Sequence, residues 1–544
     1  MTPIALFVLA LVAPPPESPA RLRVDPLLLA EAEAVWQVIA RDENPVWPGW
    51  NASDTPILVY IPGIQDVLVN HPKPPSGFAP CDGPHEFLGS REAIVVKDGP
   101  TLVEWDGQNT SREVNGVETL VVADTLSNRK QTLRGLLEDP RPPEAILADL
   151  DYERDIGTDP YAQMSMIAHE AFHVFQARRA PGKGADERHV RVYPCLSVEN
   201  NVGFALEGDA LAECLRASDA AAARAAAVRF LAVRLERRKG LPPEAIAYED
   251  GNEFAEGLAM YVELALPREL EKTRPADELR WAQGFHGFAD LGFLRERRLE
   301  GLVRNMRGEV NVNNDPYGTS PLRGRLYFSG MAIAALLDRL GAPDWKTRVF
   351  EAGTTLTSLA AEAIGATPRE LEAALGAARS GPEYARLVAS KTRLENEGRL
   401  DTARRVEAIE KGASESTPVL IDFSALGSPK IGLSFTGYGV RMVDAERTVY
   451  TLVPIEARMG SDADAFEQSI PLATLEDRNA KTFRFALPES LSAARLAELL
   501  GQPSAPKHAI SGLDLALPGV RLRARRAEIE HRGDSVLVRY LPAN

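Results

Sequence analysis

Apolar side chains recur at helical spacing through the middle of the chain, while short apolar runs bounded by Pro, Gly and Asp occupy both ends. Stripes with a period of about 3.6 residues predict amphipathic helices, and short runs rich in β-branched and aromatic residues predict strands. The predicted helices span residues 25–40, 143–150, 160–176, 202–217, 220–238, 250–266, 326–340 and 367–410. The predicted strands span residues 56–61, 93–96, 102–105, 118–122, 419–423, 431–435, 448–454, 482–487 and 536–541.

Polar residues and prolines mark the ends of several of these helices. Asp159 and Thr367 each precede a proline and are predicted to cap the helices that follow them. Asp250 is predicted to be another N-cap, because Glu253 stands three residues later and completes a capping-box pattern. Pro267 is expected to end that helix, since proline lacks the backbone N–H that a helix interior needs.

This order of elements predicts an α+β protein with a mixed N-terminal sheet, a mainly helical middle and a small β-rich C-terminal domain. Prolines at 140–143 and a Ser/Thr stretch at 414–417 mark two changes in composition. We therefore expect an N-terminal α/β subdomain at 21–150, a helical region at 151–412 and a β-rich domain at 413–544.

The first residues resemble a secretory signal. An apolar run at residues 4–13 is followed by three prolines, and small residues near position 20 suit cleavage. The run is too short to cross a bilayer as a helix. We expect residues 1–20 to be a signal peptide and the protein to be exported, to the periplasm or outside the cell, without a membrane span.

The net charge limits the class of partner, and the cysteine count limits the number of disulfide bridges. The 544 residues carry a formal charge of −15, which argues against nucleic acid as a partner because the summed field repels phosphates. Cys81, Cys195 and Cys214 are too few for a disulfide scaffold. Two alternatives stay open. Cys195 and Cys214 form a bridge, or all three cysteines are unbridged thiols that pack as small apolar groups.

The strongest chemical pattern is the run His169-Glu170-Ala171-Phe172-His173, inside the helix predicted at 160–176. At roughly 100° per residue, histidines four apart project from one helical face and can bind the same metal ion. Glu170 then lies beside the ion as a general base. The alternative is that both histidines are core residues with satisfied hydrogen bonds. We interpret the pattern as a site for one Zn²⁺ per chain, with His169 and His173 as ligands.

A catalytic zinc usually takes three protein ligands and keeps one position open, so a third ligand is expected downstream. Two glutamates compete for this role. Glu207 lies 34 residues after His173 and Glu256 lies 83 residues after it. The spacing of the residues does not decide between them.

Two further segments resemble the gluzincin metallopeptidases, the clan that includes thermolysin and the zinc aminopeptidases. Glu256-Gly257-Leu258-Ala259-Met260-Tyr261 is similar to the segment that supplies the clan's third zinc ligand, which implies Glu256. Tyr327-Phe328-Ser329-Gly330 resembles the start of a later helix whose tyrosine stabilises the oxyanion, which implies a catalytic role for Tyr327. The resemblance covers roughly residues 160–340 and implies a zincin-like helical region. The long interval before Glu256 requires an inserted helix, for which residues 220–238 are suited.

These residues predict a zinc metallopeptidase that cleaves peptide or protein substrates, with a water molecule activated by Glu170 and Tyr327 donating to the oxyanion. Two alternatives stay open. One is a catalytically inactive, zinc-containing binding or surface protein, and the other is a hydrolase of a non-peptide amide or ester.

Other polar residues are explained without a direct role as ligand or catalyst. Glu207 and Glu263 are expected on solvated helix faces or as partners that orient a ligand histidine. Tyr261 is expected to pack in the core through its ring. His71 and His85 stand in Pro-rich and Gly-rich sequence, where solvated surface histidines are the default.

Overall fold

The computed structural model describes residues 20–137, 159–310, 315–487 and 507–543, apart from residues 54, 105–106, 108, 413–415, 434–438, 452, 460, 470–471, 518 and 533–534. The described chain contains both helices and sheets, so the predicted α+β class is confirmed. It forms two compact units, Met1–Arg178 with Ala265–Leu291 and Arg179–Leu264 with Gly292–Asn544. The predicted signal peptide, apart from residue 20, and the predicted helix at 143–150 lie outside the described residues.

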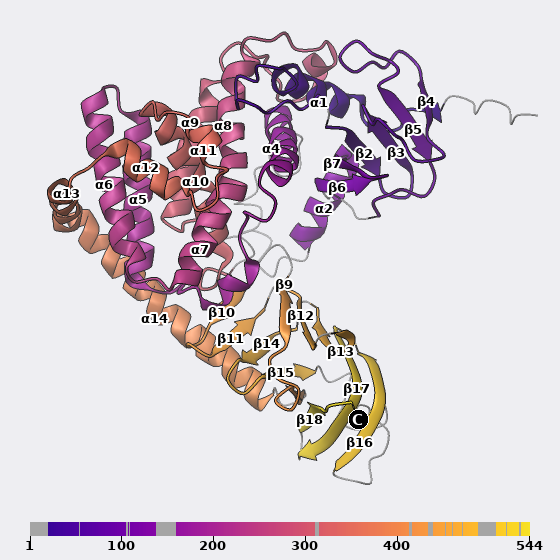
Figure 1. The fold of residues 1–544 in the computed structure, drawn as a ribbon, viewed down its shortest axis with the longest axis vertical. Coiled ribbons are helices and arrows are strands. Elements are labelled where there is room, and N and C mark those ends of the chain that lie inside the picture. Colours follow the sequence, from indigo (N-terminus) through magenta and orange to yellow (C-terminus); the bar gives the residue numbers. More distant parts are fainter. Residues whose placement is uncertain are drawn as a thin grey trace, which may run out of the picture. The chain divides into compact units, whose positions relative to one another are not determined.

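The first unit contains a mixed sheet, as predicted (Figure 1). Among the described residues its strands follow the order β1-β4-β5-β3-β2-β7-β6, with β2 parallel to β7 and antiparallel to β3. The strands are β1 Ala20–Arg21, β2 Ile57–Ile61, β3 Gln65–Val69, β4 Ala79–Asp82, β5 Ile94–Asp98, β6 Thr110–Val114 and β7 Val117–Ala123. Strand β2 is buried along its whole length, which explains its unbroken apolar sequence.

One predicted strand of this region is wrong. Residues 102–104 form no strand, and the backbone N–H of Leu102 donates to the Asp66 carboxylate at 2.8 Å. A side chain from β3 therefore takes the hydrogen bond that a neighbouring strand would have made. Helix α2, Thr125–Leu137, was not predicted, because its sequence has few apolar positions.

The helices of the first unit are α1 Pro26–Ile39, α2, α4 Pro160–Arg179 and the 3₁₀ turn η4 Glu278–Trp281. The Asp159 carboxylate accepts hydrogen bonds from the backbone N–H groups of Tyr161 and Ala162, so the predicted cap of α4 is confirmed. The Trp47 and Trp50 rings pack on Phe172 with centroid distances of 4.8 and 5.2 Å. Such aromatic pairs contribute about 0.5–1.5 kcal/mol each beyond area burial. They hold α4 against the N-terminal segment.

The second unit begins with a helical region, in which α5 and α6 pack side by side (Figure 1). Its helices are η2 Glu187–Val192, α5 Val198–Arg216, α6 Ala220–Arg238, α7 Pro243–Asn252, the π-helical turn η3 Glu253–Gly257, α8 Leu258–Leu270, α9 Gly292–Met306, α10 Ser320–Arg339, α11 Trp345–Arg348, α12 Leu356–Ile364, α13 Pro368–Ser380 and α14 Pro382–Lys411. Helix α8 runs past the boundary at Ala265. The capping box of Thr367 and Glu370 confirms the predicted start of α13.

Two predicted helix ends are wrong in this region. Asp250 is not an N-cap, because it lies inside α7 and its carboxylate accepts from Arg238 at 2.8 Å. Pro267 does not end α8, which continues to Leu270. Proline removes one hydrogen bond but its backbone angle suits a helix, and the next turn closes from the Glu271 N–H to the Pro267 carbonyl at 3.0 Å.

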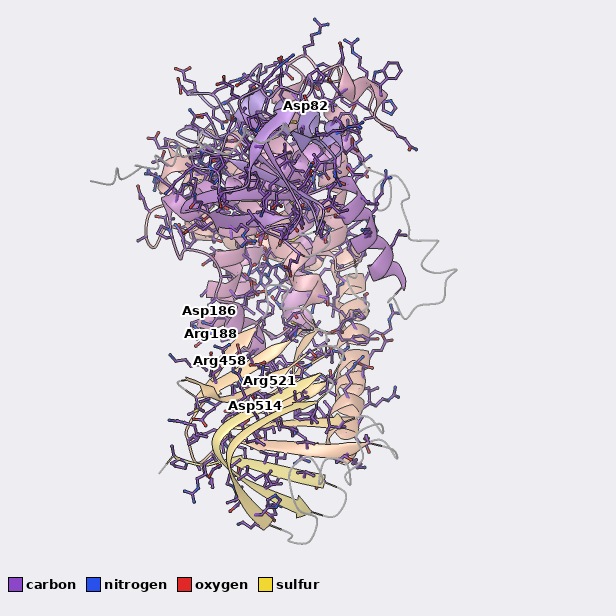
Figure 2. The ribbon with its side chains drawn as sticks, turned by 90° about the vertical axis from the view of Figure 1, so that its right-hand side faces the viewer. Asp82, Asp186, Arg188, Arg458, Asp514 and Arg521 are labelled. Carbon is purple, nitrogen blue, oxygen red and sulfur yellow. The ribbon has the colours of Figure 1, made fainter. Side chains whose placement is uncertain are left out.

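The C-terminal part is β-rich, as predicted, and its sheet has eleven strands among the described residues. They are β8 Thr417–Asp422, β9 Lys430–Leu433, β10 Val440–Met442, β11 Arg447–Tyr450, β12 Ile455–Met459, β13 Ser461–Gln468, β14 Thr474–Asp477, β15 Thr482–Leu487, β16 Lys507–Leu517, β17 Val520–Arg532 and β18 Ser535–Tyr540. The long β16–β17 hairpin was not predicted, because charged residues interrupt its apolar positions. Figure 2 shows Asp514 and Arg521 from these two strands, which form an exposed ion pair at 3.1 Å.

Packing groups the elements into these two units. Helix α4 lies in the N-terminal unit. The end of α14 packs on the C-terminal sheet through a shared core of Val406, Ile409, Val449 and Leu475. The sheet therefore belongs to the same unit as the helices before it. Among the described helices, none is long and apolar enough to cross a membrane.

Candidate metal centre

The two histidines of the HExxH pattern occupy successive turns of one face of α4. Their rings lie edge to face, with centroids 4.7 Å apart and planes at 83°. His169 is buried and His173 is partly buried, as is Glu170, which follows His169 along the helix. The neighbouring apolar positions Met164, Ile167 and Ala168 are fully buried. The core therefore fixes the helix that carries both histidines.

Gln176 sets the orientation of one histidine. The His173 Nδ1 atom lies 2.8 Å from the Gln176 Oε1 atom, and Gln176 is buried. An amide oxygen accepts a hydrogen bond, so this contact favours the tautomer with the proton on Nδ1, which is the form that presents Nε2 to a metal ion. Sequence reasoning missed Gln176, although its place three residues after His173 puts it on the same helical face.

Glu256 lies on the π-helical turn η3, between α7 and α8. Such turns widen a helix locally and are frequent at functional sites. Its Oε1 atom accepts a hydrogen bond from the Arg323 Nη2 atom at 3.0 Å, and its side chain is partly buried.

Tyr327, on α10, lies against the same carboxylate. Burial and the charge of Glu256 raise the pKa of Tyr327 above its usual value, and a side-chain hydrogen bond joins the two groups. The phenol therefore stays protonated at neutral pH and donates to Glu256. The Nε atom of Arg323 is 3.4 Å from the same hydroxyl.

Two glycines bring these segments together. A Cβ atom at Gly257 would lie 2.5 Å from the Gly330 Cα atom, and a Cβ atom at Gly330 would lie 2.6 Å from the Glu253 carbonyl oxygen. Only glycine fits at such backbone contacts. The two segments that carry the resemblance therefore touch through main-chain atoms.

His169, His173 and Glu256 form a group that can hold a metal ion. Each offers one ligand atom, and these atoms all lie within 4.8 Å of one another. Two imidazoles and one carboxylate are the ligand set of several catalytic zinc sites. The chemistry of the donors therefore fits zinc.

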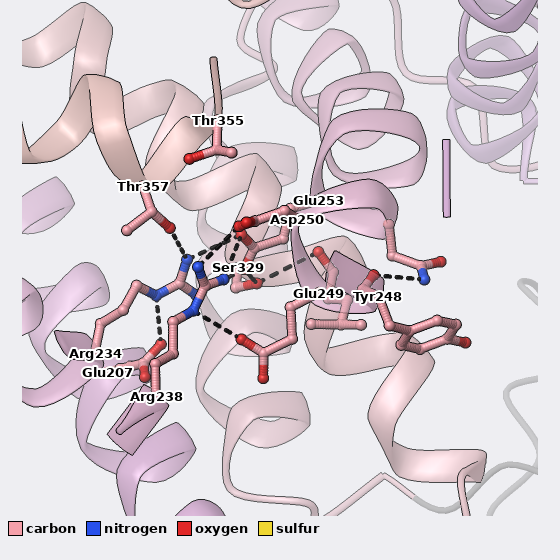
Figure 3. Close-up of polar contacts among 12 residues, drawn as sticks. Glu207, Arg234, Arg238, Tyr248, Glu249, Asp250, Glu253, Ser329, Thr355 and Thr357 are labelled. Atoms are coloured by element: carbon pink, nitrogen blue, oxygen red, sulfur yellow. Dashed lines mark hydrogen bonds and ion pairs between the residues drawn. The ribbon is translucent and has the colours of Figure 1, made fainter. Parts of the chain in front are cut away.

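The competing glutamate, Glu207, takes part in a buried ion network (Figure 3). Its two carboxylate oxygens accept from the Nε atoms of Arg234 at 3.0 Å and Arg237 at 2.5 Å. Glu207 and Arg234 have no exposed surface. The expectation of a solvated helix face at Glu207 is therefore wrong, and both of its oxygens accept from buried arginines.

The same network fixes the segment that leads to Glu256. Glu253, on the π-helical turn, accepts a two-pronged contact from Arg234 at 2.6 and 2.9 Å. Glu249, one turn earlier, accepts from Arg237 and Arg238. Burial alone raises the pKa of Glu249, but these arginine charges outweigh it and lower that pKa to about 2. Three buried arginines thus hold the turn in place.

Tyr261 and Glu263, the remaining candidates of the helical region, have structural contacts. Tyr261 is buried, with its hydroxyl donating to Asp338 and its ring 5.6 Å from Trp345, as expected. Glu263 pairs with Arg298.

His71 is not a solvated surface histidine. It is buried, its Nε2 atom lies 3.1 Å from the Val114 carbonyl oxygen, and burial lowers its pKa. The loop sequence around it gave no sign of this contact with β6. Cys81, Cys195 and Cys214 are free thiols, so Cys195 and Cys214 form no bridge.

No protein-family model, curated protein or solved structure matches the chain.

Proposed function

We propose that the protein is a zinc-dependent hydrolase of the gluzincin type that cleaves peptide bonds. The observation that carries the proposal is the grouping of His169, His173 and Glu256, with ligand atoms within 4.8 Å, where the sequence pattern predicted a zinc site. Two of these ligands stand one helical turn apart on α4. The third lies on a turn braced by buried arginines.

Zinc held by these three side chains would lower the pKa of a bound water towards about 7 and polarise a substrate carbonyl. Glu170 follows His169 along α4 and would act beside the ion without coordinating it. Its carboxylate would take a proton from the attacking water and pass it to the leaving amine. Positioned proton transfer of this kind contributes about 10²- to 10⁴-fold.

Tyr327 stays protonated because burial and the Glu256 charge raise its pKa. A neutral phenol next to a metal ligand is able to donate a hydrogen bond to a substrate oxygen as negative charge develops there. We therefore assign the oxyanion donor to Tyr327, with Glu256 as its acceptor before substrate binds.

The test combines metal content with hydrolysis. Wild-type protein is expected to carry about one zinc per chain, to cleave casein, and to stop when a chelator removes the metal. Glu170→Gln is expected to keep its zinc and to lose about 10²- to 10⁴-fold in turnover. The matched control is Glu263→Gln, since that glutamate is paired with Arg298 and should leave turnover unchanged.

Three outcomes would count against the proposal. A wild type without zinc removes its foundation. Full casein cleavage by a zinc-loaded Glu170→Gln protein removes the role of the base. A zinc-loaded wild type that leaves casein intact but hydrolyses small amides or esters would move the substrate class away from peptides.

A further inference from the structure

Arg325, on α10, is a buried cation without a carboxylate partner among the described residues. It is 4% exposed, and its Nε atom has no hydrogen-bond partner in that part of the chain. Burial lowers the pKa of Arg325 to about 10, which is the direction expected of a charge that lacks compensation. The other buried arginines of the described chain all form ion pairs with carboxylates, and they are Arg234, Arg237, Arg238, Arg323 and Arg441.

A second buried cation lies near Arg325. Lys391, on α14, is 8% exposed, and its Nζ atom donates to the Arg307 carbonyl oxygen at 2.5 Å. Burial and then the charge of Arg325 lower the pKa of Lys391 to about 8, so the two side chains lie within electrostatic reach of each other. The exposed Glu309 carboxylate opposes this shift without reversing it. Two like charges therefore share one buried region.

The neighbours of Arg325 do not compensate its charge. The ionisable groups that raise its pKa are Tyr193 and Cys195, and both are neutral at pH 7. Burial raises the pKa of Cys195 to about 12, and burial and the charge of Glu249 raise the pKa of Tyr193 well above its usual value. The Phe204 ring, whose centroid lies 5.1 Å from the guanidinium carbon, adds a cation–π contact but no charge.

We propose that Arg325 and Lys391 bind a small oxyanion of the phosphate or sulfate class. A buried charge is strongly destabilising unless an opposite charge compensates it. The paired N–H groups of a guanidinium match two oxygens of one oxyanion, and the ammonium supplies a second positive charge for a doubly charged ion. A Cβ atom at Gly308 would collide with the Arg325 Nη2 atom, so glycine keeps that end of the guanidinium uncovered.

The low exposure of both cations favours a free ion over the phosphate group of a larger molecule. The proposal uses none of the proposed zinc ligands and does not rest on the proposed function. It is tested with phosphate as the probe.

The experiment measures phosphate binding to the full chain by calorimetric titration and by thermal unfolding at constant ionic strength. Wild type is expected to bind phosphate and to unfold at a higher temperature in phosphate than in chloride, because a ligand that binds only the folded state stabilises it. Each measurement is made with and without a chelator, so that phosphate held by a metal ion is recognised. Glycerol 2-phosphate is titrated in parallel and is expected to bind more weakly than phosphate.

Variants locate the ion. Arg325→Met should weaken phosphate binding by about 30-fold or more, because it removes the paired donors. Arg325→Lys keeps the charge but not the fork, so an intermediate loss is expected. Lys391→Met should weaken binding by about 10-fold or more. In chloride, Arg325→Met should be no less stable than wild type, because an apolar chain of similar length replaces an uncompensated charge.

The control is Arg539→Met, which removes a positive charge from β18 in the same unit. Arg539 pairs with Asp422 at 2.9 Å. This variant should bind phosphate with the affinity of wild type.

Three results would overturn the proposal. The first is a wild type that binds no phosphate, or binds it only when no chelator is present. The second is an Arg325→Met protein that binds phosphate as well as wild type and is less stable in chloride, which would make the guanidinium purely structural. The third is tighter binding of chloride or glycerol 2-phosphate than of phosphate, which would exclude a small oxyanion as the ligand.

Discussion

Glu207 and Glu256 compete for one role on sequence grounds, and their surroundings differ in a way that decides what each can do. Glu207 is fully buried and each of its oxygens accepts from an arginine. Glu256 is partly buried and accepts from Arg323 and from Tyr327. Both carboxylates have donors, so the difference between them is burial: Glu207 is enclosed between two buried arginines, whereas Glu256 keeps exposed surface. The comparison teaches that complete burial between arginines marks a structural glutamate, whereas partial burial leaves Glu256 as the proposed ligand.

The largest expected effect comes from removing each glutamate in turn. Glu256→Ala should weaken zinc binding by at least about 100-fold while leaving the fold intact, because it deletes one of three ligands. Glu207→Ala should keep zinc but lose about 3–5 kcal/mol of unfolding free energy, because Arg234 and Arg237 stay buried without their shared partner. Zinc titration and urea denaturation measure the two effects. If only the Glu207→Ala variant loses zinc while it stays folded, Glu207 and not Glu256 is the third ligand.

Substitution of Tyr327 tests whether the residues around Glu256 take part in catalysis as well as in metal binding. Tyr327→Phe should retain zinc and lose about 10²- to 10³-fold in turnover, since it removes the phenol donor. Tyr261→Phe is the matched control, because that hydroxyl donates to Asp338. Steady-state kinetics on the same peptide substrate checks both. Equal losses in the two variants would show that Tyr327 acts through packing.

The network around Glu207 should make the protein sensitive to acid. Arg237 and Arg238 lower the folded-state pKa of Glu249 from 4.5 to about 2, against the effect of burial. A lowered pKa contributes stability that is present above about pH 4.5 and is lost as the pH falls towards 2, with a total of about 3 kcal/mol. Urea unfolding across this range should show the decline. Glu249→Gln should flatten it, whereas Glu362→Gln, at an exposed pair with Arg348, should not.

The smallest expected effect concerns the orientation of His173. Gln176→Ala removes the acceptor 2.8 Å from the Nδ1 atom and should weaken zinc binding about 10-fold. Gln163→Ala, on the same helix, serves as control. Chelator competition measures both, and an unchanged affinity in Gln176→Ala would mean that packing alone orients the ring.

Local patterns predicted much of the scaffold of the site. The Asp159 cap, the apolar stripe of α4 and the Thr367 capping box all depend on neighbours within a turn, and the structure has them. The histidine spacing likewise needs only the geometry of one helix. The assignment of the third ligand and of the zinc itself stays a prediction.

Contacts between residues far apart in the sequence could not be predicted from it. Asp250 and Glu253 look like a capping box, but arginines on α6 take their carboxylates. No rule of sequence spacing predicts that an arginine 12 to 19 positions away will form a buried ion pair with these carboxylates. Arg323 and Glu187 are 136 residues apart, so their contact beside Glu256 was equally hidden.

The contact of Gly257 with Gly330 has a consequence for engineering this protein. Because main-chain atoms meet there, the spacing of the helices that carry Glu256 and Tyr327 does not depend on side-chain size. Substitutions elsewhere on α8 and α10 can reshape the surroundings without altering that spacing. The glycine pair is a fixed reference point, and a side chain at either position is expected to push the two segments apart.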